Sequence, residues 1–118
     1  MKVINKPWGK EELLEVNDRY VVKRLTMKAG HKCSLQYHDF KKETIYVLSG
    51  KLIIWLEGRN PDGELIISQI TFHPGTTITI PVLTKHRMEA VDEDSIYLEC
   101  STPELDDVVR IEDDYNRK

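Results

Sequence analysis

The chain consists of short runs of β-branched and aromatic residues separated by glycine, proline, asparagine and aspartate, a pattern typical of β-strands joined by turns. Before the tail, no long segment shows the 3.6-residue spacing of an amphipathic helix. Residues 44–58 are long enough for two strands, so the total is about eight, which predicts an all-β sandwich or barrel. Strands are predicted within residues 19–30, 32–38, 44–58, 65–72, 76–80, 86–91 and 95–100.

The turns and the tail lead to more specific predictions. Residues 44–58 predict a hairpin that turns at Ser49 and Gly50. Residues 60–63, Asn-Pro-Asp-Gly, predict a second turn because proline and glycine set the backbone angles. Residues 103–115 predict a short helix or an irregular arm. The length of 118 residues suits one domain, 1–118, with one hydrophobic core.

Composition excludes several classes of partner. A net charge of −3 gives no electrostatic reason to expect nucleic acid or an anionic membrane as a partner. No apolar run approaches the ~20 residues that span a bilayer, and the first residues lack the apolar stretch of a secretory signal. Cys33 and Cys100 are too few for a disulfide framework and are expected to be reduced, which predicts a cytoplasmic protein.

Ser34, Gln36 and His38 share one face of a predicted strand, and Leu35 and Tyr37 share the other. A strand of this kind usually turns its polar face to solvent, which would leave Gln36 and His38 without a role. The alternative is that these side chains are ligands of a metal ion. The ten residues 34–43 do not decide between the two readings.

Two spaced motifs favour the metal site. In the first, five residues separate Gly30 from Gln36, one separates Gln36 from His38, four lead to Glu43 and six to Gly50. The spacing resembles the first motif of the cupin superfamily, with glutamine in place of its first histidine.

A second block follows in the order that a cupin requires. Five residues separate Gly75 from Pro81, and four more lead to His86. The resemblance implies a single-domain cupin, a jelly-roll barrel with short N- and C-terminal arms. It also implies a site for one divalent metal ion held by Gln36, His38, Glu43 and His86, in which Glu43 comes from the next strand and His86 from a strand across the barrel mouth. Zinc, manganese, nickel, cobalt and iron all accept such a set, so the identity of the ion stays open.

The Gln-x-His motif resembles the C-terminal domain of type II mannose-6-phosphate isomerases, and the resemblance extends over nearly the whole chain. It is carried by the segments KPWG, YVVKRLTMKAG, SLQYH, YVLSGKL, IPVLTKHRME and DDVVRIEDDYNR. The resemblance implies a metal-dependent aldose–ketose isomerase that interconverts mannose 6-phosphate and fructose 6-phosphate through an enediolate. Because the chain begins with methionine and is short, we expect a stand-alone cupin without the nucleotidyltransferase domain to which such domains are commonly fused.

Three basic residues are candidates for chemistry beside the metal. Lys23 shares a strand face with Leu25 and could act as acid or base, bind phosphate, or lie exposed. Arg87 matches an arginine of the family and is a second catalytic candidate, but alternation places it on the face opposite to His86, where a structural ion pair is at least as plausible. Lys41 is the candidate for contact with a substrate phosphate.

Other functions remain open at this stage. Asp39, Phe40, Leu83 and Ala90 depart from the family pattern near the expected barrel mouth, where a substrate would be selected. A metal-dependent dioxygenase or lyase acting on a small organic acid would need the same ligands. A non-catalytic sugar-binding cupin and a metal-free sugar-nucleotide epimerase are further alternatives. We expect a small-molecule partner, a sugar phosphate, and a homodimer, because exposed sheet edges favour association.

Overall fold

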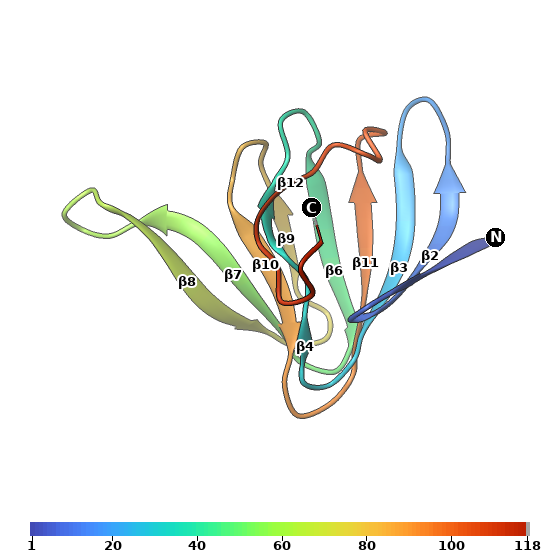
Figure 1. Ribbon diagram of the computed structural model, residues 1–118, viewed down its shortest axis with the longest axis horizontal. Coiled ribbons are helices and arrows are strands. Elements are labelled where there is room, and N and C mark those ends of the chain that lie inside the picture. Colours follow the sequence, from blue (N-terminus) through green and yellow to red (C-terminus); the bar gives the residue numbers. More distant parts are fainter. Residues whose placement is uncertain (118) are drawn as a thin grey trace.

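The computed structural model describes residues 1–117, which form two antiparallel sheets and contain no helix (Figure 1). Within these residues, no helix is long and apolar enough to cross a membrane. One sheet has the order β1-β2-β3-β11-β6-β9, and the other has the order β12-β5-β10-β7-β8, with β4 paired to β10. The strands are β1 (Lys2–Lys6), β2 (Gly9–Val16), β3 (Val21–Met27), β4 (His31–Lys32), β5 (Leu35–Tyr37), β6 (Glu43–Ser49), β7 (Leu52–Arg59), β8 (Leu65–Phe72), β9 (Thr77–Ile80), β10 (His86–Ala90), β11 (Ser95–Ser101) and β12 (Val109–Glu112).

Alternation along the strands defines the space between the two sheets. In β3, every second residue from Val21 to Met27 is buried, so Lys23 lies inward with Leu25 and is not an exposed lysine. The apolar part of the interior is a cluster of buried side chains from both sheets, to which Trp8 contributes. Its main members are Leu25, Met27, Ile45, Val47, Leu52, Ile54, Ile80, Met88 and Tyr97. The prediction of an all-β fold with one hydrophobic core is therefore confirmed.

The predicted hairpin over residues 44–58 is wrong. Strand β6 lies in one sheet and β7 in the other, so the chain turns a corner between sheets at this point. Gly50 adopts a φ of +71°, and a Cβ atom there would lie 2.2 Å from the carbonyl oxygen of Asp94. The glycine is needed for this close approach, and a Ser-Gly pair in the sequence does not reveal whether it ends a hairpin or a corner.

Strands at both ends of the chain were missed. Strands β1 and β2 form the edge of the first sheet, although their sequences are rich in lysine and glutamate. The tail contains a strand that was not predicted, β12, in which Val109 and Arg110 pair with Tyr37 and Gln36 of β5. The predicted helix is therefore wrong, and the tail is only partly irregular. In both places, pairing with a neighbouring strand outweighs weak local β-propensity.

Candidate metal centre

Three side chains of the predicted ligand set meet between the two sheets. His38 directly follows β5, His86 begins β10, and Glu43 begins β6 in the facing sheet. Strands β5 and β10 are neighbours, with His86 opposite Gln36. The expectation that His86 comes from a strand across the barrel is therefore wrong; Glu43 is the residue that reaches the site from the other side.

The ligand atoms of His38, Glu43 and His86 all lie within 4.8 Å of one another. The Nε2 atom of His86 is 3.0 Å from Glu43 Oε1, and the Nε2 atom of His38 is 3.9 Å from the same oxygen. All three residues are at most 3% exposed. Two imidazoles and a carboxylate at this spacing form a set that binds a divalent first-row ion and leaves coordination positions open.

The hydrogen bonds of the two rings orient Nε2 toward the centre. Nδ1 of His38 lies 2.5 Å from the carbonyl oxygen of Asp107, and Nδ1 of His86 lies 2.8 Å from that of Thr84. A carbonyl oxygen only accepts, so each Nδ1 carries the proton and each neutral ring presents a lone pair on Nε2. This second contact is typical of metal-ligating histidines.

The resulting arrangement needs a cation. When His86 is neutral, its Nε2 and Glu43 Oε1 are both acceptors, yet they lie 3.0 Å apart. The Nε2 atom of His38 is buried without a hydrogen-bond partner in residues 1–117. Either a proton on Nε2 or a metal ion between the ligands resolves this conflict, so the residues fit the group that the sequence predicts.

The pKa shifts follow from the same geometry. Burial, together with the charge of Lys41, lowers the pKa of His38. Burial would also lower the pKa of His86, but the contact with the Glu43 carboxylate outweighs burial and raises it. For Glu43, burial is outweighed by the contact with His86 and the charge of Lys41, so the pKa of this carboxyl lies well below its usual range. Glu43 is therefore ionised and available as a ligand.

Gln36, the predicted fourth ligand, lies beside this group. Its Cα faces that of His86 across the β5–β10 pair. Its side-chain oxygen accepts a hydrogen bond of 2.7 Å from the hydroxyl of the fully buried Ser34. This hydrogen bond holds the Gln36 amide on the strand face that Gln36 shares with His38.

A ladder of alternating charges leads away from the centre. Lys41 Nζ lies 3.3 Å from Glu43 and 3.0 Å from Glu99, and Lys23 Nζ lies 4.0 Å from Glu99 and 3.3 Å from Glu11. Lys23, Lys41 and Glu99 are each 6% exposed. Burial would lower the pKa of Lys41, but the charges of Glu99 and Glu43 outweigh it and raise the pKa.

Glu99 is the buried residue that sequence reasoning missed. Burial, followed by the charge of Glu43, raises the pKa of its carboxyl. A signal was present in the sequence, because Glu99 alternates with Tyr97 and Ser101 on the buried face of β11. An acidic residue on the inward face of a strand indicates an internal partner, here Lys41.

A pocket of about 400 Å³ lies at the far end of this ladder. Lys23 and Glu11 line it, as does Asp106, which precedes the residue whose carbonyl contacts His38. Three further basic residues, Lys2, Lys6 and Arg110, give the pocket more cationic than anionic side chains. A negatively charged small molecule is the ligand class that this lining favours.

Arg87 lies elsewhere, and its candidacy as a catalytic residue is not supported by its position. It is 1% exposed, but it follows His86 in β10 and faces the opposite side of the sheet. Its Nε donates to the carbonyl oxygen of Cys33 at 2.9 Å, its guanidinium lies over Trp55, and Nη2 contacts Asp114 at 3.4 Å. Alternation along the strand therefore favours the structural ion pair.

Leu83 marks a departure at the edge of the site. It adopts a φ of +61°, in the left-handed region that favours glycine, where the cupin motif has glycine. Its backbone N–H donates to the carbonyl oxygen of His38 at 2.7 Å. The unusual conformation of Leu83 thus helps to fix the chain next to a candidate ligand.

The chain is similar to known proteins in sequence and in fold. Residues 1–113 match the family described as mannose-6-phosphate isomerase C-terminal. Over 118 residues the chain is 33% identical to mannose-1-phosphate guanylyltransferase of Escherichia coli K12, covering 97% of this chain and 23% of that protein. It is 34% identical over 114 residues to a putative mannose-1-phosphate guanylyltransferase of Vibrio cholerae, covering 92% of this chain and 22% of the relative. The chain thus spans about a quarter of the length of these relatives.

Solved structures with the same fold have diverged further in sequence. KdgF from Halomonas sp. has a TM-score of 0.74 at 18% identity, covering 90% of this chain and 91% of that one. CapF from Staphylococcus aureus, a capsular polysaccharide assembling protein, has a TM-score of 0.74 at 23% identity, covering 94% and 34%. A Bacillus subtilis oxalate decarboxylase with Mn(II) centres has a TM-score of 0.75 at 20% identity, covering 94% and 30%. The fold is that of the cupins, and the chain belongs to the mannose-6-phosphate isomerase C-terminal family.

Proposed function

We propose that this protein is a divalent-metal-dependent sugar-phosphate isomerase that interconverts mannose 6-phosphate and fructose 6-phosphate. The observation that carries the proposal is the convergence of His38, Glu43 and His86, whose ring orientations leave both Nε2 atoms facing the carboxylate. Gln36 would supply a neutral fourth ligand. Membership of the mannose-6-phosphate isomerase C-terminal family supports the choice of substrate.

The bound ion would supply electrophilic stabilisation of the negative charge that develops on the substrate oxygens. The protein supplies the remaining functions. His38, Glu43 and His86 would hold the ion between the sheets, where all three side chains are buried. The basic lining of the pocket at Lys2, Lys6 and Lys23 would bind the phosphate.

The proton must move between adjacent carbons of the sugar, and Glu99 is a better candidate for this step than Arg87. Its pKa is raised by burial, which brings a carboxyl closer to the value that favours proton transfer near neutral pH. Lys41 is held between two carboxylates and therefore serves best to orient Glu99 and Glu43. This position also differs from the predicted contact of Lys41 with phosphate, which Lys2 and Lys6 are better placed to make.

The test is a coupled assay of mannose 6-phosphate conversion with protein stripped of metal and reloaded with zinc, manganese, cobalt or nickel. We expect metal-dependent turnover that His38→Ala and Gln36→Ala abolish or greatly reduce. His73→Ala removes an exposed histidine outside the site and is the matched control. Stoichiometric metal binding without turnover for any ion would contradict the isomerase, and oxygen uptake with organic acids would then test the dioxygenase alternative.

A further inference from the structure

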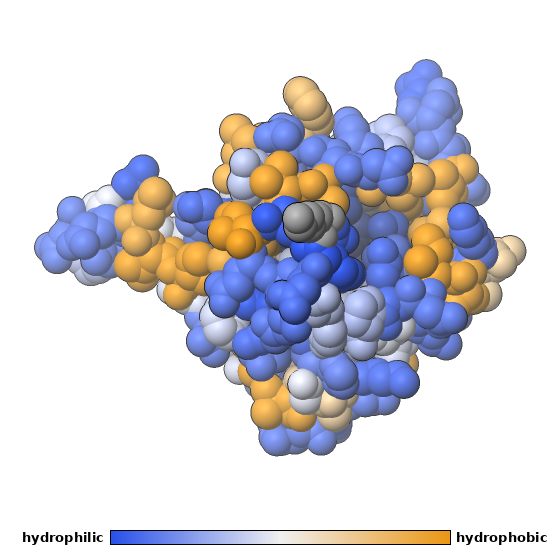
Figure 2. Space-filling view, in the orientation of Figure 1, coloured by the Kyte–Doolittle hydropathy of each residue, from blue (hydrophilic) through white to orange (hydrophobic). Residues whose placement is uncertain are grey.

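The chain after β11 returns from one sheet to the other close to the candidate metal centre. Residues 102–112, the connecting segment, begin beside β11 and end in β12, which pairs with β5 (Figure 1). Figure 2 shows many hydrophilic side chains over the C-terminal part of the chain, and Leu105 and Ile111 are 40% and 48% exposed. Because these apolar side chains are not buried, polar contacts must contribute much of the attachment of this segment to the barrel.

The carboxylate of Asp107 accepts hydrogen bonds from three successive backbone N–H groups. Its Oδ1 accepts from Asp39 at 3.1 Å, and its Oδ2 accepts from Phe40 at 2.7 Å and from Lys41 at 2.9 Å. Successive N–H groups that converge in this way form a concave site for an anion. Here the anion is a side chain of the connecting segment, so the carboxylate holds that segment against residues 38–42, the ligand loop between β5 and β6.

The main chain of Asp107 contacts the same loop at its first residue. Its carbonyl oxygen accepts the proton of His38 Nδ1 at 2.5 Å, and this contact leaves the lone pair of the neutral ring on Nε2. The backbone N–H of Leu83 also contacts His38, but it donates to the backbone carbonyl oxygen and so holds the backbone and not the ring. The orientation of the His38 ring therefore depends on where the Asp107 carbonyl lies.

The carboxylate and the carbonyl of Asp107 act on the ligand loop together. Without the carboxylate, three backbone N–H groups would lose their acceptor and the connecting segment would lose its charged contact with the loop. Hydrogen bonds to a charged group are stronger than those between neutral groups, so the carbonyl would no longer be held in place against the His38 ring. The change would also reach Lys41, which is one of the three donors and whose Nζ lies 3.3 Å from Glu43.

We propose that Asp107 is a positioning residue, which aims Nε2 of His38 at the bound ion by docking the connecting segment on the ligand loop. This role rests on the proposed metal centre and requires no contact between Asp107 and the ion. Among the described residues, the group that could hold a metal consists of His38, Glu43 and His86. The carboxylate of Asp107 is occupied by backbone donors instead, as expected of a partner that orients a ligand.

The first measurement needs no metal, because the tautomer of a histidine ring is read from the chemical shifts of its two nitrogens. At pH 8 the His38 ring is neutral, since burial lowers its pKa. In the metal-free wild type we expect the Nδ1–H tautomer alone, and in Asp107→Ala a mixture of the two tautomers. Asp107→Asn keeps one acceptor oxygen but sets an NH2 group against a backbone N–H, so we expect an intermediate mixture.

The second measurement is a cobalt titration of the same three proteins. Partners that orient metal ligands change metal affinity roughly ten- to hundredfold. We therefore expect the dissociation constant of Asp107→Ala to rise roughly tenfold or more, together with a changed visible spectrum of the bound cobalt. Asp107→Asn should lie between this variant and the wild type.

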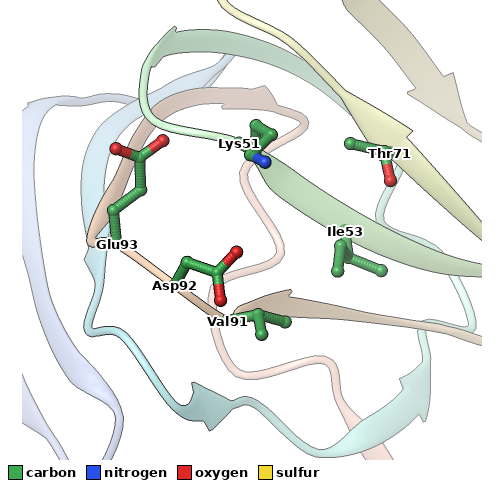
Figure 3. A pocket seen from close by; sticks show the side chains of 6 residues that line it. All are labelled: Lys51, Ile53, Thr71, Val91, Asp92 and Glu93. Carbon is green, nitrogen blue, oxygen red and sulfur yellow. The ribbon is translucent and has the colours of Figure 1, made fainter.

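Asp94→Ala is the matched control. Asp94 also accepts a backbone N–H, that of Ala29 at 2.9 Å. It follows Asp92 and Glu93, which line the pocket shown in Figure 3, at the end of β10 away from the metal centre. The tautomer of His38 and the cobalt affinity should both equal those of the wild type in this control.

An unchanged tautomer and an unchanged cobalt affinity in Asp107→Ala would overturn the proposal, and the same result in Asp107→Asn would do so if the alanine variant does not fold. Equal losses in Asp107→Ala and Asp94→Ala would assign the effect to general destabilisation and would likewise overturn it. A wild type that binds no cobalt would contradict the proposed function, while the tautomer comparison would still decide whether Asp107 orients His38.

Discussion

His86 and Arg87 are neighbours on β10, and both are almost completely buried, yet their surroundings differ. Arg87 faces outward and has partners for its guanidinium in Cys33, Asp114 and Trp55. His86 faces inward, and its Nε2 atom lies 3.0 Å from Glu43 Oε1, a pair that needs a proton or a metal ion between the two atoms. Burial alone therefore does not indicate function in this barrel. The informative difference is whether the polar atoms are satisfied by the protein itself.

The same contrast applies to the groups around these two residues. On the inner side, the charges of Glu43, Lys41 and Glu99 compensate one another only in part, since burial and mutual repulsion still raise the pKa of Glu99. On the outer side, the guanidinium of Arg87 is bound by the Cys33 carbonyl oxygen, the Asp114 carboxylate and the Trp55 ring, so its charge and its hydrogen-bond donors have partners. We expect substitutions on the inner side to change ligand binding, and substitutions on the outer side to change stability.

The largest effect is expected from His86→Ala. Loss of one of the two imidazoles should weaken divalent-metal affinity by more than roughly a hundredfold, since even indirect partners of ligands contribute ten- to hundredfold. Titration calorimetry with zinc and cobalt measures the change, with His73→Ala as the control. Unchanged metal affinity in His86→Ala would remove this residue from the candidate centre.

Arg87→Met should act on stability instead. The change leaves the Cys33 carbonyl without its donor and removes the packing on Trp55, so the free energy of unfolding should fall by about 3 kcal/mol. Metal affinity should change less than about threefold. Urea denaturation with parallel metal titration measures both quantities. If Arg87→Met had normal stability but had lost metal binding, Arg87 would belong to the metal centre and would not be a structural residue.

The membership of the inner group was largely predictable from the sequence, because cupin spacing singles out His38, Glu43 and His86 together, although it placed His86 on the wrong strand. Alternation likewise placed Lys23 on the strand face of Leu25, while leaving an exposed position open, and placed Arg87 on the face opposite to His86. These inferences depend on periodicity within one strand or on a spaced motif. Both are local properties of the sequence.

The partners of the buried charges were not predictable in the same way. Lys41 meets Glu99 although 58 positions separate them, and no local pattern joins the two. The turn between the two sheets at Gly50 could not be predicted from the local sequence either. The backbone that approaches Gly50 belongs to Asp94, which is distant in the sequence. Strand order, which decides both contacts, is set by the packing of the whole barrel.

A smaller effect should distinguish the two cysteines. Burial raises the pKa of the Cys33 thiol to about 11, and the Cys33 sulfur accepts a hydrogen bond from the Met88 N–H. A raised folded-state pKa contributes stability below the unfolded value of 9.0 that is lost as pH rises toward 11. In a Cys100→Ser background, the free energy of unfolding should therefore fall by about 1.4 kcal/mol between pH 8 and 10.

The matched measurement is the same pH series with Cys33→Ala in that background, where this decrement should be absent. Titrations of lysines and tyrosines are common to both proteins and cancel in the difference. Thiol labelling of the wild type at pH 8 should modify the exposed Cys100 and leave Cys33 unmodified. Equal pH slopes for the two proteins would show that Cys33 does not titrate in this range.

The smallest effect, and the one with the least obvious direction, is that of Lys41→Gln. The Lys41 ammonium lies 3.3 Å from Glu43, so a metal ion bound at the candidate centre would be repelled by a neighbouring positive charge. Removing that charge should strengthen metal binding roughly fivefold, about 1 kcal/mol. Glu43 should remain ionised at neutral pH, because the contact with His86 also holds its pKa down.

Lys42→Gln is the control for Lys41→Gln, because it removes the same charge from the next residue, whose side chain is exposed. Its metal affinity should equal that of the wild type, since solvent screens an exposed charge. Weaker binding in Lys41→Gln would show that Lys41 acts mainly by orienting Glu43 and Glu99. The inner charges would then be as firmly structural as the contacts of Arg87, and the contrast between the two sides of β10 would depend on the histidines alone.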